Sequence, residues 1–188
     1  MNYLVRTAQL KDLADLVDVL SNSFHASTGI MRWFSPILRL GVYEDLRQRL
    51  RSPDSDNYIC FVAVALIADN SLTTAPVVGT VEVTLKPTFP LQVCSSTPYP
   101  YLSNLAVKLD CRRQGIAQRL LEASEKAVKD WGCRDLYLHV LEDNYQARRL
   151  YSKVGYKVKQ TDPLWRSLIF RQPRRLLLHK TLTSFSTS

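Results

Sequence analysis

The apolar and polar positions of the chain recur with two different periods, and each period predicts a different kind of element. Apolar residues at every third or fourth position predict helices over Leu10–Phe24, within Ile37–Arg51, over Gly115–Trp131 and over Asn144–Val154. The third of these has the most regular apolar stripe, and Gly132 follows it as a stop signal. We therefore expect four helices.

Segments rich in β-branched and aromatic residues separate the helices and predict strands. Tyr58–Ala68 is apolar throughout, as expected of a strand buried on both faces, whereas Val77–Leu85 alternates and predicts a half-buried strand. The other predicted strands are Tyr3–Arg6, Tyr101–Val107, Leu136–Val140, a segment starting at Gly155–Lys159, and one within Arg175–Leu182. The resulting order, βααβββαβαββ, predicts an α/β fold with a mixed sheet and helices on both faces.

The segment Lys86–Pro100 contains four prolines, which lack a backbone donor, so it is predicted to be irregular. A loop of this length in a compact domain is often functional. Its aromatic residues either wall a slot for a substrate or belong to an ordinary surface loop, and both interpretations stay open.

The 188 residues fit a single domain, which we expect over residues 1–183, followed by a flexible tail at 184–188. Hydrophobic residues make up 46% and charged residues 22%, which excludes disordered, collagen-like and coiled-coil classes. The longest apolar run, Ile59–Ala68, is shorter than the ~20 residues that a membrane span needs, so no membrane partner is expected. Widely spaced cysteines without a CxxC pair, and only three histidines, predict reduced thiols and no metal.

The net charge of +8 is concentrated in the second half of the chain. Up to Val107 there are 8 basic and 9 acidic residues, and from Lys108 onward there are 17 basic and 8 acidic. A basic half predicts an anionic partner: a nucleic acid, a membrane surface or a phosphate-rich cofactor. The acidic residues of the first two helices either attract a cationic acceptor or simply face water.

The segment from Asp110 to Ala117 follows a predicted strand and opens a predicted helix. The start of a helix has unsatisfied N–H groups and a partial positive charge, Gly115 allows close approach of the backbone, and Arg112 and Arg113 add charged donors. A phosphate or pyrophosphate suits such a turn. The spacing matches neither the dinucleotide GxGxxG nor the P-loop motif. On spacing alone, surface arginines in the first turn of a helix remain an equal alternative.

Two motifs then decide the interpretation, because together they resemble the GCN5-related N-acetyltransferases (GNAT). They read Leu105-Ala106-Val107 with Arg112-x-x-Gly115-x-Ala117, and Asn144-x-x-Ala147-x-x-Leu150-Tyr151-x-Lys153-x-Gly155-Tyr156. They lie in the family's order, the second starting 27 residues after Ala117, and the stretch from Leu102 to Tyr156 is most similar to the plastid and cyanobacterial branch. The resemblance implies a mostly antiparallel seven-stranded sheet with helices on both faces and a central splay between the fourth and fifth strands.

Acetyl-CoA, as a cosubstrate, is the ligand that this resemblance implies. In the family, the fourth strand leaves its neighbour and pairs with the pantetheine arm, and the following turn wraps the pyrophosphate. The cofactor-binding residues implied here are Leu105, Ala106, Val107, Arg112, Arg113, Gln114, Gly115, Ile116, Ala117, Gln118, Asn144, Tyr145, Gln146 and Tyr151. Leu105 and Val107 are also expected in the core, and Asn144 is also expected to cap its helix.

Tyr151 has a second implied role as the catalytic acid. In the family, the matching tyrosine reprotonates the departing thiolate. A phenol with a pKa of ~10 suits a thiol with a pKa of ~8.5. The alternative is a tyrosine that only packs in the core.

A base is also needed, because a lysine with a pKa of ~10.4 is almost always charged at pH 7, and an α-amine with a pKa of ~7.7–8.0 is mostly charged. His139 shares one strand face with Tyr137 and is a candidate catalytic base, with a reference pKa of ~6.5. It departs from the glutamate that related bacterial N-terminal acetyltransferases place in a similar position. Glu82, an ordered water, or a histidine that only packs under a helix remain as alternatives.

The leading hypothesis is an N-acetyltransferase that moves acetyl from acetyl-CoA to a protein amine, on a lysine or an N-terminus, by direct attack in a ternary complex. Catalysis through cysteine is not expected, since Cys111 lies in the turn and Cys94 has no evident base. The alternatives are a small amine such as an arylalkylamine or polyamine, or a non-catalytic basic module; no nucleic-acid motif supports the latter. We expect a monomer or homodimer in the cytoplasm, or in the plastid stroma if a transit peptide was removed.

Overall fold

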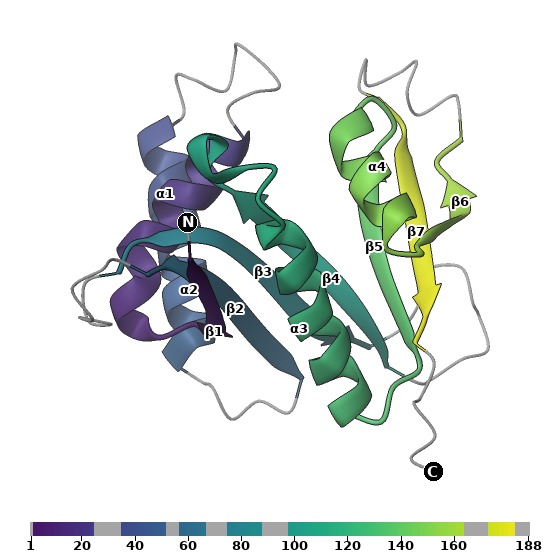
Figure 1. Cartoon of the computed structure of the whole chain (residues 1–188), viewed down its shortest axis with the longest axis horizontal. Helices are drawn as coiled ribbons and strands as arrows, with labels where there is room; N and C mark the ends of the chain where they lie inside the picture. Colours follow the sequence, from purple (N-terminus) through teal and green to yellow (C-terminus); the bar gives the residue numbers. More distant parts are fainter. Residues whose placement is uncertain are drawn as a thin grey trace. The chain divides into compact units, whose positions relative to one another are not determined.

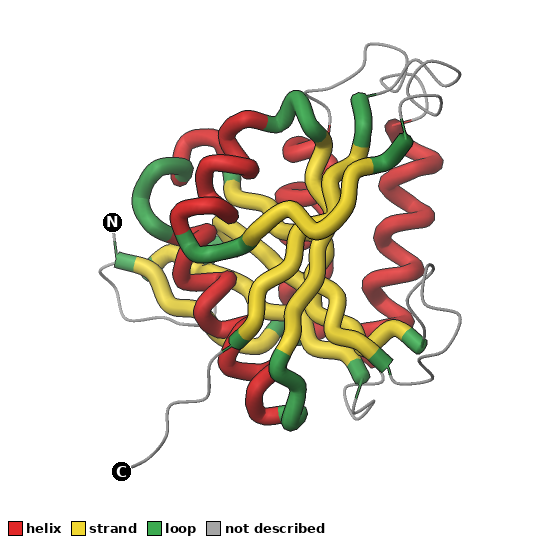
Figure 2. The backbone as a smooth tube through the Cα atoms, turned by 90° about the vertical axis from the view of Figure 1, so that its right-hand side faces the viewer, coloured by secondary structure: helices red, strands yellow, loops and turns green. Residues whose placement is uncertain are grey.

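The computed structural model describes residues 2–24, 35–51, 57–66, 75–87, 98–163 and 173–182, whose helices and strands are drawn in Figures 1 and 2. The described helices are α1 (Leu13–Phe24), α2 (Ser35–Arg51), α3 (Ile116–Asp130) and α4 (Tyr145–Lys153), with short 3-10 helices η1 (Leu10–Asp12) and η3 (Leu109–Cys111). The strands are β1 (Tyr3–Thr7), β2 (Tyr58–Ala65), β3 (Val77–Lys86), β4 (Tyr99–Val107), β5 (Asp135–Leu141), β6 (Lys157–Thr161) and β7 (Arg175–Thr181). The predicted order of elements is confirmed.

The described strands form a seven-stranded sheet in the order β1-β2-β3-β4-β5-β7-β6. The pairs β1–β2, β5–β7 and β6–β7 are antiparallel, and β4–β5 is parallel. The β4–β5 ladder joins only Tyr101 to Tyr137 and Leu102 to Leu138 among the described residues, although both strands continue beyond it. The predicted mixed seven-stranded sheet is confirmed, and the shortened ladder lies between the two strands for which a splay is expected.

The chain divides into two compact units, and each is described by itself. The first unit contains Met1–Val83 and Asn104–Ser124, and the second contains Thr84–Ser103 and Glu125–Ser188. β3, β4 and α3 each contribute residues to both units.

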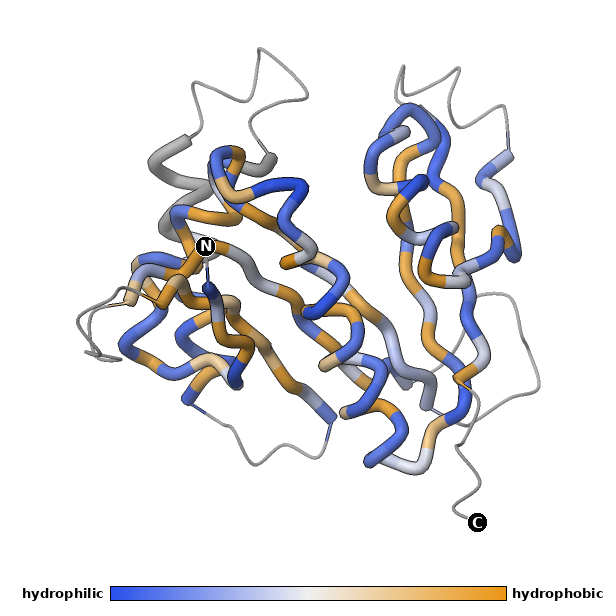
Figure 3. Tube along the Cα trace, in the orientation of Figure 1, coloured by the Kyte–Doolittle hydropathy of each residue, from blue (hydrophilic) through white to orange (hydrophobic). Residues whose placement is uncertain are grey.

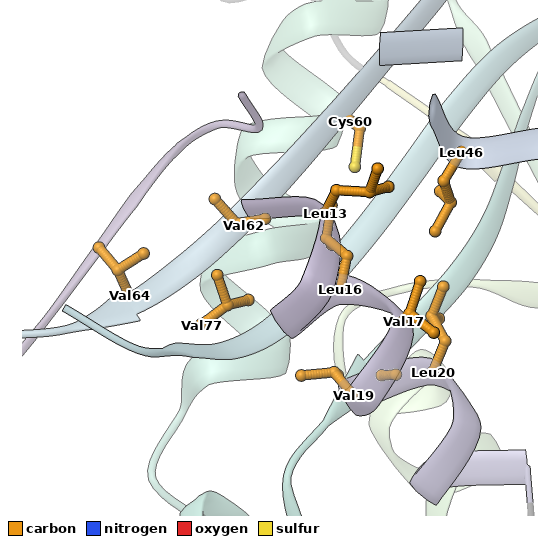
Figure 4. Packing of buried hydrophobic residues seen from close by; sticks show 11 residues of the cluster. Leu13, Leu16, Val17, Val19, Leu20, Leu46, Cys60, Val62, Val64 and Val77 are labelled. Carbon is orange, nitrogen blue, oxygen red and sulfur yellow. The ribbon is translucent and has the colours of Figure 1, made fainter. Parts of the chain in front are cut away.

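The core of the first unit is built on the apolar stripe of α1. Burial of such a side chain stabilises the fold by about 1.5–3 kcal/mol relative to exposure. The apolar residues of α1 that recur at helical spacing are all buried, and they pack with one residue of α2 and with residues of the strands (Figure 4). The cluster comprises Leu13, Leu16, Val17, Val19, Leu20, Leu46, Cys60, Val62, Val64, Val77 and Ala106.

Gly79 of β3 allows the first part of α3 to lie close against the sheet of this unit. A Cβ at this position would lie 3.1 Å from Ala106 O and 3.2 Å from both Ile116 Cγ2 and Leu120 Cδ1. Ile116 and Leu120 belong to the buried stripe of α3. In Figure 3, hydrophobic (orange) and hydrophilic (blue) positions alternate along this helix. A side chain at Gly79 would push α3 outward, so this glycine sets the position of the helix start.

The second unit has a sheet with one apolar face. Leu136, Leu138 and Val140 of β5 are buried, while Tyr137 and His139 point to the other face, as the alternation predicts. On β7, the register places His179 beside Tyr137. The reactive side chains of β5 therefore lie on the face opposite its apolar one.

Two predictions about β3 and β4 are wrong in part. β3 is buried on both faces from Val77 to Val83, because groups from other elements of the first unit cover its polar residues as well. β4 starts at Tyr99, so Tyr99 and Pro100 belong to a strand; proline is tolerated at the start of a strand, where its missing N–H costs little. Residues 88–97 of the proline-rich segment lie outside the described residues.

Candidate active site

A left-handed turn leads from β4 into α3 in the first unit. Arg113 and Gly115 have positive φ angles of 65° and 81°, a conformation that glycine adopts without strain. The N–H of Arg119 donates to Gly115 O at 3.1 Å, so the N–H groups of residues 116–118 precede the first helical bond of α3. Such donors, together with the helix dipole, bind anions.

The side chains of this turn are partly engaged by the protein itself. Arg112, Arg113 and Gln114 are exposed, and Arg112 Nε donates to Val107 O at 3.1 Å. The hydroxyl of Tyr3 donates to Gln114 O at 3.2 Å. The sequence analysis did not identify this role of Tyr3, because a contact over 111 residues leaves no local pattern. Arg112 therefore holds the turn to the end of β4.

The part of β4 that leads to the turn begins with an irregular residue. Asn104 has a φ of 53°, a left-handed conformation that asparagine tolerates better than most residues. It is followed by Leu105, which is half-buried, and by Ala106 and Val107, which are buried. A left-handed residue interrupts the regular strand, and the predicted pantetheine-binding segment starts directly after it.

Glu82 holds this irregular residue in place. Its carboxylate is fully buried and accepts from Asn104 Nδ2 at 3.0 Å and from Arg49 Nη1 at 2.8 Å. Burial raises the pKa of Glu82, while the bonds from Asn104 and Arg49 oppose that rise. By sequence, Glu82 is an alternative base on the polar side of a half-buried strand, but the structure shows it covered and paired. The pattern of β3 could not reveal that Arg49 of α2, 33 residues away, covers it.

The start of α4 in the second unit carries the next predicted residues. Asn144 Oδ1 accepts from Ala147 N at 3.1 Å, so the predicted helix cap is confirmed. Tyr145 is 71% exposed, Gln146 is exposed, and the guanidinium of Arg148 lies 5.9 Å from the Tyr145 ring. These groups are accessible to a ligand.

Tyr151 of α4 is buried, and its ring meets the ring of Tyr156 edge-on at 5.7 Å. Burial raises the pKa of Tyr151, and the neighbouring Tyr101 adds to the effect. No hydrogen bond joins its hydroxyl to any of the described residues. A phenol in this setting keeps its proton at neutral pH, which is the state that an acid needs.

His139 forms a hydrogen bond with a second tyrosine on the same face of the second unit. Tyr101 Oη lies 2.9 Å from His139 Nδ1. Burial lowers the pKa of His139, and the cation of Arg175 lowers it further, against the opposing effect of Asp162. Burial raises the pKa of Tyr101. A phenol that keeps its proton can donate to a neutral imidazole at this distance, and such a pair can relay a proton. Tyr101 was not among the predicted site residues.

A comparison with known families decides the classification. The model of the acetyltransferase (GNAT) family matches residues 28–156. This chain belongs to the GNAT family. GCN5-related N-acetyltransferase 10, chloroplastic, from Arabidopsis thaliana is 34% identical over 169 residues, which cover 86% of this chain and 64% of the relative. The chain thus spans just under two thirds of that relative's length.

Solved structures share the fold at low identity. The PaiA N-acetyltransferase from Thermoplasma acidophilum in complex with coenzyme A has a TM-score of 0.71 and 19% identity, over 96% of this chain and 99% of that one. The NatC complex bound to Gag peptide and CoA contains a chain with a TM-score of 0.67 and 16% identity, over 97% of this chain and 100% of that one. The GNAT fold is therefore established for this chain.

The cysteines of this GNAT chain are poor nucleophiles where they are described. Cys60 is buried, and burial raises its pKa to about 12. Burial also raises the pKa values of Cys111 and Cys133. Cys94 lies outside the described residues. No cluster of histidine, cysteine or acidic side chains among the described residues has the arrangement of a metal site, and no described helix is long and apolar enough to cross a membrane.

The acidic side chains of η1, α1 and α2 bind groups of this chain. Asp12 is buried against Arg6 at 2.6 Å, Asp15 accepts from Val77 N, and Asp18 lies 3.7 Å from Lys108. Glu44 and Asp45 pair with Arg47 and Arg49. Asp12 therefore does not simply face water, because the ion pair with Arg6 makes its burial possible. By sequence, Trp33 and Phe34 beside Ser35–Pro36 are a candidate exposed binding ridge, but both aromatic residues lie outside the described residues.

Proposed function

We propose that this chain is an acetyl-CoA-dependent N-acetyltransferase that acts on a primary amine of a protein, either a lysine or an N-terminal α-amine. The observation that carries the proposal is the turn before α3, where left-handed Gly115 precedes free N–H groups at the start of a 15-residue helix. Membership of the GNAT family and the fold shared with a coenzyme A complex support it.

The cofactor side of the proposal follows the residues that the family resemblance implies. The N–H groups of Gly115 and of residues 116–118 would bind the pyrophosphate, with Arg112, Arg113 and Gln114 at its edge. The backbone of residues 105–107 would pair with the pantetheine amides. Asn144, Tyr145 and Gln146 would contribute polar and ring contacts to the cofactor arm. The free donors of the turn and the exposure of these side chains fit an anionic ligand.

The proton of the amine goes to the Tyr101–His139 pair. The amine nitrogen attacks the thioester carbonyl carbon, a C–N bond forms, and the C–S bond breaks. The phenol oxygen of Tyr101 takes a proton from the amine as its own proton moves to His139 Nδ1, 2.9 Å away. His139 is suited to receive it because its lowered pKa keeps the imidazole neutral at pH 7.

Tyr151 supplies the proton that the departing thiolate needs. Its raised pKa keeps the phenol protonated until the thiolate forms, and a thiolate close to the hydroxyl would then accept the proton. The packing against Tyr156 fixes the direction of the ring.

A small aromatic amine is the second candidate acceptor. Tyr99 meets Tyr137 edge-on at 5.6 Å, and Tyr137 stacks on His179 at 4.7 Å, so the second unit has a row of rings on which an aryl group can stack. The NatC complex with its peptide, which shares this fold, supports the protein acceptor instead.

The chloroplastic name of the curated relative supports a plastid location. A fluorescent fusion of the protein in living cells tests this location.

Two measurements test the proposal. Calorimetry with acetyl-CoA should give a saturable heat, and an assay with lysine peptides, peptides with free N-termini and aryl amines should release coenzyme A with one class. Absence of coenzyme A affinity, together with salt-dependent DNA binding, would favour a basic binding module. Binding of acetyl-CoA without transfer of acetyl to any of these amines would contradict the proposed acetyltransferase activity.

A further inference from the structure

One face of the second unit places cations beside the Tyr101–His139 pair. We call it the acceptor face and define it by Lys86, Tyr101, His139 and Arg175. The ammonium of Lys86, at the end of β3, lies 3.5 Å from the centroid of the Tyr101 ring. Arg175, at the start of β7, is close enough to lower the pKa of His139. The charged groups that act on His139 are therefore Arg175, Lys86 and the opposing Asp162.

Lys86 differs from Arg174, Arg175 and Lys180 in the group that neutralises its charge. Arg175 Nε lies 3.1 Å from Asp162 Oδ2, Arg174 pairs with Glu142 at 2.6 Å, and Lys180 pairs with Glu125 at 2.7 Å. Within the part of the chain that the structure describes, no carboxylate pairs with Lys86. Its charge rests on an aromatic ring, and a ring contact leaves an ammonium, which has three N–H donors, able to pair with an anion as well.

Such a cation changes which amine this face accepts. A positive charge near the acceptor disfavours its ammonium form and so increases the fraction of reactive neutral amine. It also repels an acceptor that carries further cations, such as a polyamine or a basic peptide. A carboxylate near the amine offsets the repulsion by pairing with the lysine.

We propose that the acceptor face selects amines with a carboxylate close by, and that the acceptor is a protein N-terminus followed directly by aspartate or glutamate. The inference rests on the proposed acetyltransferase activity and names the acceptor class of the same site. The α-amine is favoured over lysine because its pKa of ~7.7–8.0 demands less of a weakly basic histidine.

Three peptides of equal length with one reactive amine each test the proposal. They begin Ser-Asp-Asp, Ser-Ser-Ser and Ser-Arg-Arg, contain no lysine, and are compared by kcat/KM at saturating acetyl-CoA. We expect the acidic peptide to exceed the neutral one by about fivefold, and the basic peptide to be the poorest. The acidic preference should shrink as salt rises to 0.5 M, because the pair is near the surface.

Variants of Lys86 then locate the preference. Lys86→Met, which keeps the apolar stem, should bring the acidic-to-neutral ratio close to one, Lys86→Arg should retain it, and Lys86→Glu should invert it. Lys126→Met removes an exposed lysine of α3 paired with Asp130 and should leave the ratio unchanged. Calorimetry with acetyl-CoA on every variant identifies any that has lost its fold.

The outcomes separate this inference from the proposed function. If the wild-type chain acetylates no amine, the proposed function is wrong, and the inferred acceptor class is wrong as well. If it acetylates peptides with no acidic preference, or if Lys86→Met keeps the preference, only the acceptor class is overturned. Retention of the wild-type ratio at high salt would likewise exclude pairing with Lys86.

Discussion

The two compact units carry very different charges. By sequence, the first unit has 11 basic and 11 acidic residues, and the second has 14 basic and 6 acidic, so the net charge of +8 belongs to the second unit. In the first unit, the described acidic side chains of η1, α1 and α2 pair with donors of the same unit. The buried Glu82 accepts from Arg49 and Asn104. In the second, the pair Tyr101–His139 lies near cations.

Under the proposed function, the comparison assigns the backbone turn for binding and the reactive side chains to different parts of the chain. The first unit supplies a braced backbone turn, whose donors are fixed by packing around Gly79 and Tyr3. The second unit supplies phenols and an imidazole whose pKa values are shifted by burial. Substitutions at this turn of the first unit should therefore change cofactor affinity, and substitutions at the phenols and the imidazole of the second should change turnover.

The largest expected effect is on the turn of the first unit. Gly115→Trp should weaken acetyl-CoA binding by more than about 100-fold, or about 2.8 kcal/mol, because the indole fills the space in front of the free N–H groups. Calorimetry measures it. Gly132→Trp is the matched control, since Gly132 also has a positive φ, 74°, and nothing lies within 4 Å of a Cβ there. Equal affinity in the two variants would place the phosphates elsewhere.

The next effect belongs to the second unit. Tyr151→Phe should lower kcat by about 100-fold or more, the usual contribution of a positioned acid, with little change in acetyl-CoA affinity. Steady-state kinetics and calorimetry on one preparation measure both values. Tyr156→Phe, which changes the neighbouring buried ring, serves as the control. Unchanged turnover of Tyr151→Phe across the pH range would remove Tyr151 from the mechanism.

A smaller effect with a distinct pH signature is expected at His139. The neutral imidazole is the active form and its pKa is lowered, so the rate should fall with acidification only below the ordinary histidine range near ~6.5. His139→Gln should cost about tenfold in kcat and abolish that acid limb. His179→Gln, beside Asp135 on the same sheet, should keep the limb. An acid limb that persists in His139→Gln would mean that another group titrates.

The last expected effect is on stability rather than on binding or turnover, and it concerns the irregular residue of β4. Asn104→Ala should lower the free energy of unfolding by about 2–3 kcal/mol, from a left-handed alanine and a lost bond to buried Glu82. Asn104→Gly keeps the left-handed backbone and should recover about 1 kcal/mol of the loss. Urea denaturation measures both. If the two variants are equally stable, the backbone conformation at this position carries no cost.

The sequence by itself determined the features that depend on nearby residues. The order of helices and strands follows from the periods of apolar residues, and the cap at Asn144 follows from a bond to Ala147 three residues away. The turn at Gly115 follows from a glycine between a strand and a helix, and the two GNAT motifs are themselves local. Each of these rests on backbone preferences within one or two turns of chain.

Only the tertiary structure decided which distant polar groups meet. Glu82 is buried because Arg49 and Asn104, 33 and 22 residues away, satisfy its carboxylate, and nothing in the alternation of β3 reveals them. Tyr101 and His139 are brought together over 38 residues by the short parallel ladder of β4 with β5. A buried charge is tolerated only with its partners, and partners far apart in sequence are chosen by packing.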